Sequence, residues 1–462
     1  MRPGVESSRP SLCGTPSPPA WARSSKATVP CGGNGRERFR PGSVSPFPPS
    51  VRTRWLAVAG AILAAVALSA HAGPVDLRLP GGALLTFAPD AEPAGLHPDA
   101  SDEVARGRGL FFRDWYRASG PGRGTALGPH FDAVSCSGCH AEIAAPGALA
   151  GPPVLKPVAV DDVQRFAGQV NHYAVPPMLV EATSRVRSTY RVFRLRDGTV
   201  ELARTRTAEV ATRAGARVPA TLRSTPVLLG WGLLENADEE MLALFEDVAD
   251  SDGDGISGRR RRLDGAGEIH GMFGWKGGVA DLQTQVASAL YHDMGLTSDA
   301  FPQGDAPEVD GASLSALAAY VRQIGVPDRR PETAESRRGA IVFGTLGCDA
   351  CHVPVLLTSP HVDPALSEQV IWPFTDLLLH DMGPGLAAGD DPDAREWRTA
   401  PLWGLGWVKA RRPDHGFLHD GRAGTMQEAI LWHGGEAARA RSRFVALNKA
   451  ERAALLAYLE RL

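Results

Sequence analysis

The sequence shows no strong bias of charge. Its 462 residues include 49 Lys and Arg against 52 Asp and Glu, for a formal net charge of -3. The basic run Arg259 to Arg262 is short and has acidic residues on both sides. Because a nucleic-acid-binding surface needs a larger basic cluster, the sequence predicts no nucleic-acid partner.

The apolar run near the N-terminus is too short to span a membrane comfortably. From Arg52 to Ala72 the chain has basic residues, then the apolar residues 55–68, then small residues, which is the order of a secretory signal peptide. We therefore predict a signal peptide at residues 51–72 and export to the periplasm, with an uncleaved N-terminal membrane anchor as the alternative. Residues 1–50 have no apolar periodicity and are predicted to be a disordered or mis-assigned extension.

Cysteine is scarce, and none is left over for a structural disulfide. The sequence has 6 cysteines, of which Cys13 and Cys31 precede the predicted signal peptide. The others form two patterns of the type Cys-x-x-Cys-His, namely Cys136-Ser137-Gly138-Cys139-His140 and Cys348-Asp349-Ala350-Cys351-His352. A chain cleaved at the predicted site would have no thiol outside these two patterns.

The Cys-x-x-Cys-His pattern suits a haem joined to the chain through both cysteines, because the next residue can then ligate the iron. A zinc site made from the two cysteine pairs would not need a histidine after each, and a redox dithiol rarely carries one. We therefore predict two covalently bound haem c groups, with His140 and His352 as proximal ligands. Haem c is attached outside the cytoplasm, which agrees with the predicted export.

Periodicity predicts two units in the mature chain. In the first, residues 73–328, Ser101 is placed to cap a helix that runs to about Trp115, and residues 313–324 have one apolar helical face. Residues 179–210 alternate apolar and polar side chains on both sides of Asp197-Gly198, as a β-hairpin does. The first unit is therefore predicted to be helical with a β-hairpin insertion.

A second unit, residues 334–462, follows a predicted linker at residues 326–333. It begins with Arg338-Gly339-Ala340, which echoes Arg108-Gly109-Leu110 before the first motif, and its last helix begins at Asn448. We predict a mainly α fold of two tandem cytochrome c-like domains, each with one covalent haem, and with the β-hairpin inserted in the first.

Further stretches carry a family pattern. They are Phe273-Gly274-Trp275-Lys276, His292-Asp293-Met294-Gly295, Leu379-His380-Asp381-Met382-Gly383, Arg395-Glu396-Trp397-Arg398-Thr399-Ala400-Pro401-Leu402 and Phe417-Leu418-His419-Asp420-Gly421-Arg422-Ala423, which leads to His433. Together with the haem motifs they resemble the bacterial di-haem cytochrome c peroxidase superfamily, in particular its branch of di-haem oxidoreductases, described as peroxidases or thiol oxidoreductases. The resemblance covers most of residues 106–462.

The resemblance implies that the N-terminal haem binds peroxide, that the C-terminal haem relays electrons, and that Trp275 lies between them. Gln285, ten residues after Trp275, matches a distal glutamine. Asp293 takes the place of a distal glutamate, two positions early and one carbon shorter. The residues alone also fit two structural alternatives, a buried core tryptophan at position 275 and a helix end at Asp293-Met294-Gly295.

The resemblance also implies axial ligands. His433, fourteen residues after His419, takes the place of a methionine or tyrosine ligand and would make the second haem bis-imidazole. The alternative is a surface histidine before a glycine turn. For the first haem we predict a five-coordinate iron with an open distal face, or an iron weakly ligated by His172 or His292.

An acidic loop predicts calcium. Asp250, Asp252 and Asp254 alternate with other residues before a glycine turn, which is the spacing of a calcium-binding loop. Arg261 stands where an EF-hand has its bidentate glutamate, so the loop would be a partial site. Structural calcium is also common in the superfamily. The alternative is a solvated acidic turn.

We therefore expect an exported di-haem oxidoreductase of peroxidase type. Asp293 and Gln285 would move the protons and position the oxygens of hydrogen peroxide, and electrons would arrive through the second haem and Trp275 from a small cytochrome c or cupredoxin. The alternatives are an electron-transfer protein whose irons are both six-coordinate, and a haem-based sulfur or thiol oxidoreductase. The sequence does not decide between a monomer and a homodimer.

Overall fold

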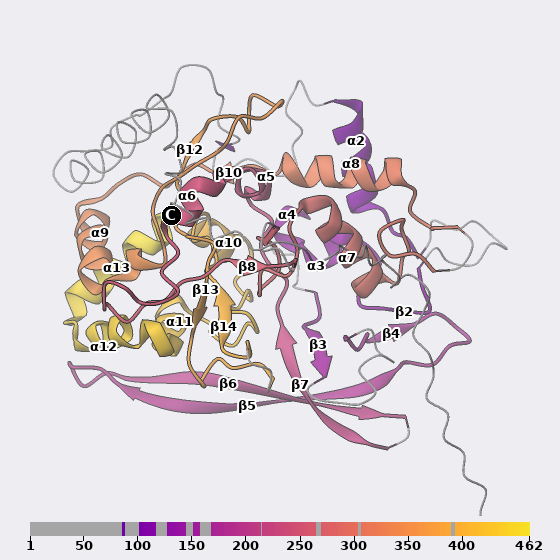
Figure 1. Cartoon of the computed structure of the whole chain (residues 1–462). Coiled ribbons are helices and arrows are strands. Elements are labelled where there is room, and N and C mark those ends of the chain that lie inside the picture. The colour runs from indigo at the N-terminus through magenta and orange to yellow at the C-terminus, as the bar shows by residue number, and fades with distance from the viewer. Residues whose placement is uncertain are drawn as a thin grey trace, which may run out of the picture. The chain divides into compact units, whose positions relative to one another are not determined.

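The computed structural model describes the backbone of residues 86–87 and residues 101–116, 127–144, 151–157, 168–213, 215–264, 269–303, 306–389 and 393–462 (Figure 1). The predicted N-terminal extension and signal peptide lie outside the described residues. No helix in the described ranges is long and apolar enough to cross a membrane.

Helices form most of the regular secondary structure in the described ranges. They are α2 (Asp102–Phe112), α3 (Cys136–Cys139), α4 (Ala141–Ala144), α5 (Trp231–Glu235), α6 (Glu239–Leu244), α7 (Leu282–Met294), α8 (Gly311–Arg322), α9 (Ala334–Leu346), α10 (Leu405–Arg411), α11 (Met426–Trp432), α12 (Ala438–Ala446) and α13 (Lys449–Arg461), with the 3-10 turns η2 (Cys348–Ala350) and η3 (Gly435–Ala437). The predicted caps are confirmed, because the Ser101 side chain accepts from Val104 N and Asn448 forms a capping box with Glu451. Helix α2 ends at Phe112, earlier than predicted, because Arg113 is extended.

Each motif follows a helix that packs against a closing helix. Gly107 of α2 lies against Ala316 of α8, where an added Cβ would be 1.8 Å from the Ala316 carbonyl oxygen. Gly339 of α9 lies against Ala454 of α13 in the same way, with a corresponding distance of 2.0 Å. The two helices are therefore equivalent as predicted, but the matching glycines differ. Gly107 is the structural counterpart of Gly339, whereas Gly109, which the sequence pattern aligned with Gly339, faces open space.

The predicted β-hairpin is confirmed and is part of a larger sheet. Strands β5 (Ala182–Arg194) and β6 (Val200–Thr212) pair antiparallel, with Arg194 opposite Val200 next to the turn. The sheet also contains β7 (Arg217–Arg223) and β3 (Val154–Pro157) in the order β3-β7-β6-β5. Strand β5 is therefore an edge strand, as Figure 1 shows at the bottom of the view.

The described residues also form five two-stranded sheets, of which β1–β10 and β2–β4 join segments that are distant in sequence. They pair β1 (Thr86–Phe87) with β10 (Val326–Pro327), β2 (His130–Phe131) with β4 (Tyr173–Ala174), β8 (Arg261–Arg262) with β9 (His270–Gly271), β11 (Leu356–Leu357) with β12 (Val370–Ile371), and β13 (Leu379–Asp381) with β14 (Glu396–Arg398). The predicted linker at residues 326–333 therefore begins as a buried strand. The described residues form a mixed fold of helices and small sheets, with more β-structure than the predicted mainly α fold.

The main apolar core takes side chains from both predicted units. Trp403 and Trp407 belong to the same buried cluster as Trp231 and Leu229, and the Trp403 indole N–H donates to the Leu229 carbonyl oxygen at 3.0 Å. A second cluster around α9 and α13 includes Leu195 from the tip of the β5–β6 hairpin. The residues from Pro74 on form one unit in the structure, so the boundary between two tandem domains stays a prediction.

Candidate functional site

The first motif presents His140 with one ring nitrogen already engaged. Ser135 caps α3 by accepting from Gly138 N, and His140 ends this short helix. The His140 Nδ1 atom lies 3.1 Å from the Pro226 carbonyl oxygen, so Nδ1 carries the proton. Nε2 is then the nitrogen left for a metal, and the carbonyl holds the ring as partners of metal-bound imidazoles usually do.

The second motif repeats this arrangement. Gly347, with a φ of 81°, ends α9 and leads into η2, which carries Cys348. The His352 Nδ1 atom lies 3.0 Å from the Phe374 carbonyl oxygen, which again leaves Nε2 for a metal. In both motifs the histidine donates through Nδ1 to a backbone carbonyl oxygen, which fits the predicted pair of proximal ligands.

The cysteine environments fit thioether attachment better than dithiol chemistry. Burial raises the pKa of Cys136, Cys139 and Cys348 to about 12. A thiolate is the reactive form in redox exchange and zinc binding, and these surroundings disfavour a thiolate. The residues at each motif therefore fit a covalently attached haem.

His433 faces His352 at a spacing that suits two ligands of one metal. The centres of the two rings are 6.4 Å apart. A metal–nitrogen bond of about 2 Å on each side, plus about 1 Å from nitrogen to ring centre, requires about 6 Å. The His433 Nδ1 atom donates to the Ala429 carbonyl oxygen at 2.9 Å, which leaves Nε2 for the metal. His433 is therefore not the surface histidine of the alternative interpretation.

Both of these imidazoles are held neutral. Burial lowers the pKa of His352 to about 4, and burial also lowers the pKa of His433. A neutral imidazole is the form that ligates a metal. The second motif thus has donors suited to both faces of an iron.

The first motif has no such partner. Among the described residues, no histidine ring lies opposite His140 at a spacing comparable with that between His352 and His433. His172 Nδ1 is 2.6 Å from Asp132 Oδ1, and His292 Nδ1 is 2.9 Å from the Ser288 carbonyl oxygen. As with His433, these Nδ1 contacts leave Nε2 of His172 and His292 available, so they exclude neither histidine as a ligand, and the open face at the first motif stays a prediction.

Asp293 belongs to a buried polar cluster that the sequence did not reveal. Gln169 Nε2 donates to Asp293 Oδ1 at 2.6 Å and to Asp132 Oδ2 at 3.2 Å. Asp132 and Gln169 are both buried, and Asp132 Oδ1 also accepts from the backbone N–H of His172 at 2.8 Å. Burial, together with the Asp132 charge, raises the pKa of Asp293 despite the Gln169 hydrogen bond. The cluster adjoins the first motif, since the Asp293 charge contributes to the raised pKa of Cys139 after burial.

Gln285 and Asp293 lie on the same helix but too far apart to act on the same group. Both belong to α7, which ends at Gly295 in the left-handed conformation, so the predicted helix end is confirmed. Eight residues along a helix correspond to about 12 Å. Gln285 Oε1 is instead 3.8 Å from the position of a Cβ added to Gly274. Gln285 is therefore next to Trp275 in the chain fold, and Asp293 is next to the first motif.

Trp275 is part of a group of tryptophans near His433. Its indole N–H donates to the Ser224 carbonyl oxygen at 2.8 Å, and its side chain packs against the buried cluster of Trp397 and Trp432. Trp432 directly precedes His433. Trp275 is partly buried at the edge of this cluster, so it is not the buried core tryptophan of the structural alternative.

Trp397 has a dense set of contacts that sequence reasoning did not identify. The His419 ring stacks on it with centres 3.6 Å apart and an angle of 6° between the planes. Lys276 Nζ lies 4.0 Å from the ring centre of Trp397, and Arg223 lies 4.8 Å from it. Cations over an indole face are favourable contacts. Two of the family stretches, around Trp397 and His419, therefore meet in space.

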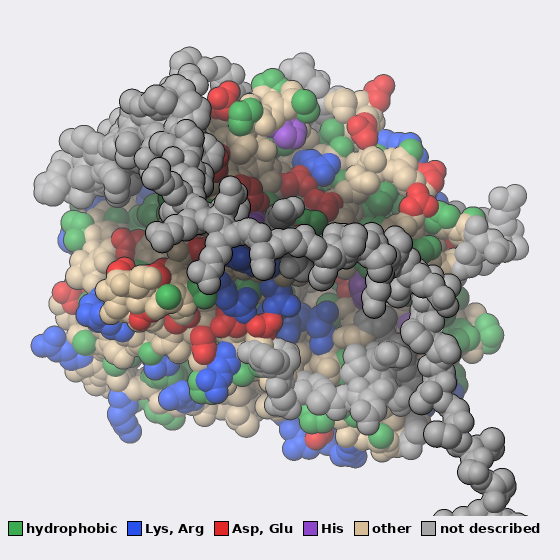
Figure 2. All heavy atoms as spheres, viewed as in Figure 1, with side chains coloured by type: hydrophobic (Ala, Val, Ile, Leu, Met, Phe, Trp, Pro, Cys, Tyr) green, Lys and Arg blue, Asp and Glu red, His purple; other side chains and the backbone are tan. Residues whose placement is uncertain are grey.

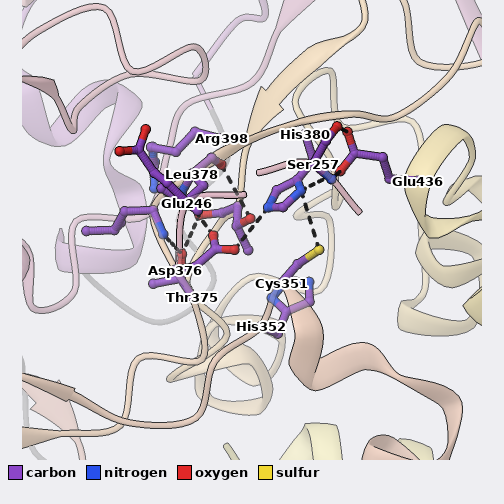
Figure 3. Close-up of polar contacts among 12 residues, drawn as sticks. Glu246, Ser257, Cys351, His352, Thr375, Asp376, Leu378, His380, Arg398 and Glu436 are labelled. Carbon is purple, nitrogen blue, oxygen red and sulfur yellow. Dashed lines mark hydrogen bonds and ion pairs between the residues drawn. The ribbon is translucent and has the colours of Figure 1, made fainter. Parts of the chain in front are cut away.

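A third family stretch places His380 beside the second motif. Figure 3 shows its ring between Asp376 and Glu436, with Nε2 2.9 Å from Asp376 Oδ2 and Nδ1 2.7 Å from Glu436 Oε2. The Cys351 sulfur is 3.7 Å from Nδ1. Burial alone would lower the pKa of His380, but its hydrogen bonds, chiefly that to Asp376, raise the pKa to about 12. His380 is therefore a buried, positively charged ring that neutralises the carboxylates of Asp376 and Glu436 next to Cys351.

The acidic loop has the geometry of the predicted calcium site. Carboxylate oxygens of Asp250, Asp252 and Asp254 all lie within 4.8 Å of one another. Gly253 and Gly255 have φ values of 74° and 88°, which let the loop turn sharply around these side chains. Calcium binding itself stays a prediction.

The comparisons with known proteins address the C-terminal region. Residues 305–462 match the model of a family described as "Di-haem oxidoreductase, putative peroxidase". No curated protein matches the chain. A solved structure of hydrazine synthase from Kuenenia stuttgartiensis, pressurized with xenon, is similar with 15% sequence identity and a TM-score of 0.38, over 85% of this chain and 100% of that one, which is too weak a likeness to support an argument. The match to this family is confined to the C-terminal region, from residue 305 on.

Proposed function

We propose that the protein is an exported, periplasmic di-haem c oxidoreductase that reduces hydrogen peroxide at the N-terminal haem with electrons relayed through the C-terminal haem. The observation that carries this proposal is the difference between the two motifs. His433 lies opposite His352, whereas the described residues provide no histidine opposite His140. One site is suited to electron transfer alone, and the other is suited to a substrate.

The chain's own residues have distinct roles in this proposal. A bound haem would supply an iron that exchanges single electrons and, where one face is free, accepts a small ligand. His140 and His352 would hold the two irons through Nε2, oriented by the carbonyl groups of Pro226 and Phe374. His433 would close the second site.

Asp293 is the residue best placed to move a proton at the first motif. Gln169 holds its Oδ1 atom at 2.6 Å. Because burial raises the pKa of Asp293, the carboxyl is shifted toward the range in which it can both accept and return a proton. Gln285, in contrast, lies near Trp275 and would act at that end of α7.

The tryptophan group would connect the two motifs. Trp275 packs against the buried cluster that contains Trp432, the residue before His433, and the carbonyl of Ser224 accepts from its indole N–H. The runner-up function, electron transfer without peroxide chemistry, requires a sixth ligand at the first iron, and among the described residues no histidine ring faces His140 as His433 faces His352. A sulfur or thiol substrate at the first motif is a further alternative that the same spectroscopic test addresses.

The test of this function is a ferric optical spectrum followed by stopped-flow mixing of the holoprotein with stoichiometric peroxide. We expect one high-spin and one low-spin haem, and a rapid spectral change in the half-reduced form. Two low-spin haems and no change with peroxide would favour electron transfer alone. A change with a thiol substrate but none with peroxide would favour the sulfur alternative.

Haem stoichiometry is a separate prediction. Because both motifs are complete, the mature protein made in a host with the attachment machinery should carry two covalent haems. Mass spectrometry of the denatured protein should give the apoprotein mass plus two haems. A Cys348→Ala, Cys351→Ala double variant should lose one haem mass, and a wild-type protein with a single haem would contradict the assignment.

Calcium should stabilise the fold through the acidic loop. A ligand that binds only the folded state at about 100 times its Kd adds about 2.7 kcal/mol, which for a chain of this size corresponds to a Tm increase of roughly 2–5 °C. We expect this increase when calcium is added to the metal-free holoprotein. Asp252→Asn should abolish it, whereas Asp299→Asn, an exposed aspartate in another loop, should retain it. An unchanged Tm in the wild type would leave the loop a solvated acidic turn.

A further inference from the structure

The outer edge of the β-sheet carries exposed apolar side chains. All residues of β5 from Thr183 to Val192 are exposed. Tyr190 is 61% exposed, Val192 is 54% exposed, and Leu202, which pairs with Val192 on β6, is 57% exposed. Proteins rarely expose apolar side chains on an unpaired strand edge unless another molecule binds there.

Arginines line the other side of the same strand edge, because successive side chains of a strand point to opposite faces and Arg191 therefore points away from Tyr190 and Val192. Strand β5 has Arg185, Arg187, Arg191 and Arg194 and contains no acidic residue. The neighbouring α12 adds Arg439, Arg441 and Arg443. Among the described residues, none of these arginines forms an ion pair with a carboxylate. Figure 2 shows Lys and Arg side chains along the lower part of the molecule, where Figure 1 draws β5, β6 and α12.

This basic surface lies directly over the second motif. A Cβ added to Gly434, the residue after His433, would be 3.8 Å from Arg441 Nη1, and Arg443 Nη1 donates to the Leu346 carbonyl oxygen at 3.2 Å, two residues before Cys348. Arg191 is close enough to Arg441 that its charge, after burial, lowers the pKa of Arg441. The hairpin is fastened to α12 by the Arg196 N–H, which donates to the Val445 carbonyl oxygen at 3.0 Å. A short path therefore leads from the exposed edge through Arg441 to His433.

We propose that the surface formed by β5 and α12 is the docking site of an acidic redox protein that delivers electrons to the haem held by His352 and His433. The inference rests on the proposed function and identifies the surface and charge of its partner. Tyr190 and Val192 supply apolar contacts on one face of the strand edge, and Arg191 with the arginines of α12 supplies basic contacts on the other face. Interfaces between proteins combine both kinds of contact. Opposite charge on the partner would steer it to this surface and increase the association rate.

The charges disfavour the other occupants of this surface. A second copy pairing edge to edge through β5 would bring arginines of the two copies together, and like charges on facing strands are destabilising. An anionic lipid surface would also attract arginines, but it would gain nothing from their position over His433. A soluble protein that carries an electron is the occupant for which this position matters.

The experiment uses the holoprotein and a reduced cupredoxin of net negative charge as the probe, with reduction of the low-spin haem followed by stopped flow. We expect the second-order rate to fall about tenfold between about 10 mM and about 200 mM salt. The double variant Arg191→Glu, Arg439→Glu should slow the reaction about tenfold or more at low salt. Arg217→Glu, which reverses an exposed charge on β7 of the same sheet, should change the rate by less than about twofold.

A small uncharged hydroquinone serves as the control reductant, because it needs no docking surface. It should reduce the wild type and all variants at the same rate, which also verifies that the variants fold and hold both haems. The proposal is overturned by equal cupredoxin rates in the wild type and the double variant. It is also overturned if Arg217→Glu slows the reaction as much as the double variant does. Peroxide turnover with hydroquinone tests the proposed function separately, so the two failures are distinguishable.

Two further measurements decide between the occupants. If the double substitution abolishes binding to anionic vesicles but leaves the cupredoxin rate unchanged, the surface binds lipid and the proposal fails. If it converts a dimer to a monomer with the same unchanged rate, the surface is an interface between copies and the proposal fails.

Discussion

Replacing His433 with Ala is expected to convert one haem from low spin to high spin and to raise its reduction potential. The ring centres of His433 and His352 are 6.4 Å apart, so removal of one imidazole leaves an iron with a single protein ligand. Axial ligands shift haem potentials over a range of about 0.8 V, and loss of a strong imidazole donor should raise this potential by on the order of 100 mV. Electron paramagnetic resonance and a spectroelectrochemical titration measure the two effects.

Added imidazole and a second variant distinguish ligation from a general loss of structure. Free imidazole should restore the low-spin signal of His433→Ala, and His433→Met should stay low spin with a potential above that of the wild type. His270→Ala, at a partly buried histidine on β9, serves as the matched control and should leave both haems unchanged. Survival of the full low-spin signal in His433→Ala would mean that another residue is the ligand.

Replacing Asp293 with Asn is expected to slow peroxide consumption by about 10²-fold or more, which is the usual contribution of one acid–base group. Asparagine keeps the shape of the side chain but cannot take up and return a proton. The optical spectra of both haems should stay nearly the same, because Asp293 is a partner of Gln169 and not a metal ligand.

The pH dependence adds a signature that a structural role would not produce. Burial raises the pKa of Asp293, so the wild-type rate should increase with pH as this carboxyl loses its proton, at a pH above the ordinary range for aspartate. Asp293→Asn should lack this limb of the profile. Asp299→Asn should retain both the limb and the rate, since Asp299 is exposed beyond the end of α7. A wild-type profile in Asp293→Asn would remove Asp293 from the mechanism.

Local signals in the sequence were sufficient for several elements. Ser101 and Asn448 are caps because their side chains reach backbone N–H groups of their own first helical turn. Asp197-Gly198 marks the hairpin turn because few other residues adopt its conformation. The third and fourth strands of the same sheet were missed, since β3 and β7 are short and their pairing depends on segments far away in the chain.

Some residues of the candidate site could likewise be identified from local sequence, and others only from the structure. The two Cys-x-x-Cys-His motifs are identifiable because haem attachment requires those residues at consecutive positions. His433 came from a family spacing, and only the structure brings it to 6.4 Å from His352, across eighty residues of chain. Asp132 and Gln169 carry no local signal at all. Only the structure shows that both are buried beside Asp293. Because a buried carboxylate needs hydrogen-bond donors, Gln169 donates to both Asp132 and Asp293.

The sequence by itself determined the chemistry that depends on neighbouring residues: two haem motifs, the helix caps and the hairpin turn. The tertiary structure alone decided what depends on long-range packing: a histidine that faces His352, no histidine that faces His140 among the described residues, and a basic strand edge near His433. The physical reason is that covalent attachment and capping act within a few residues, whereas ligand pairing, burial and surface charge depend on which distant segments the core brings together.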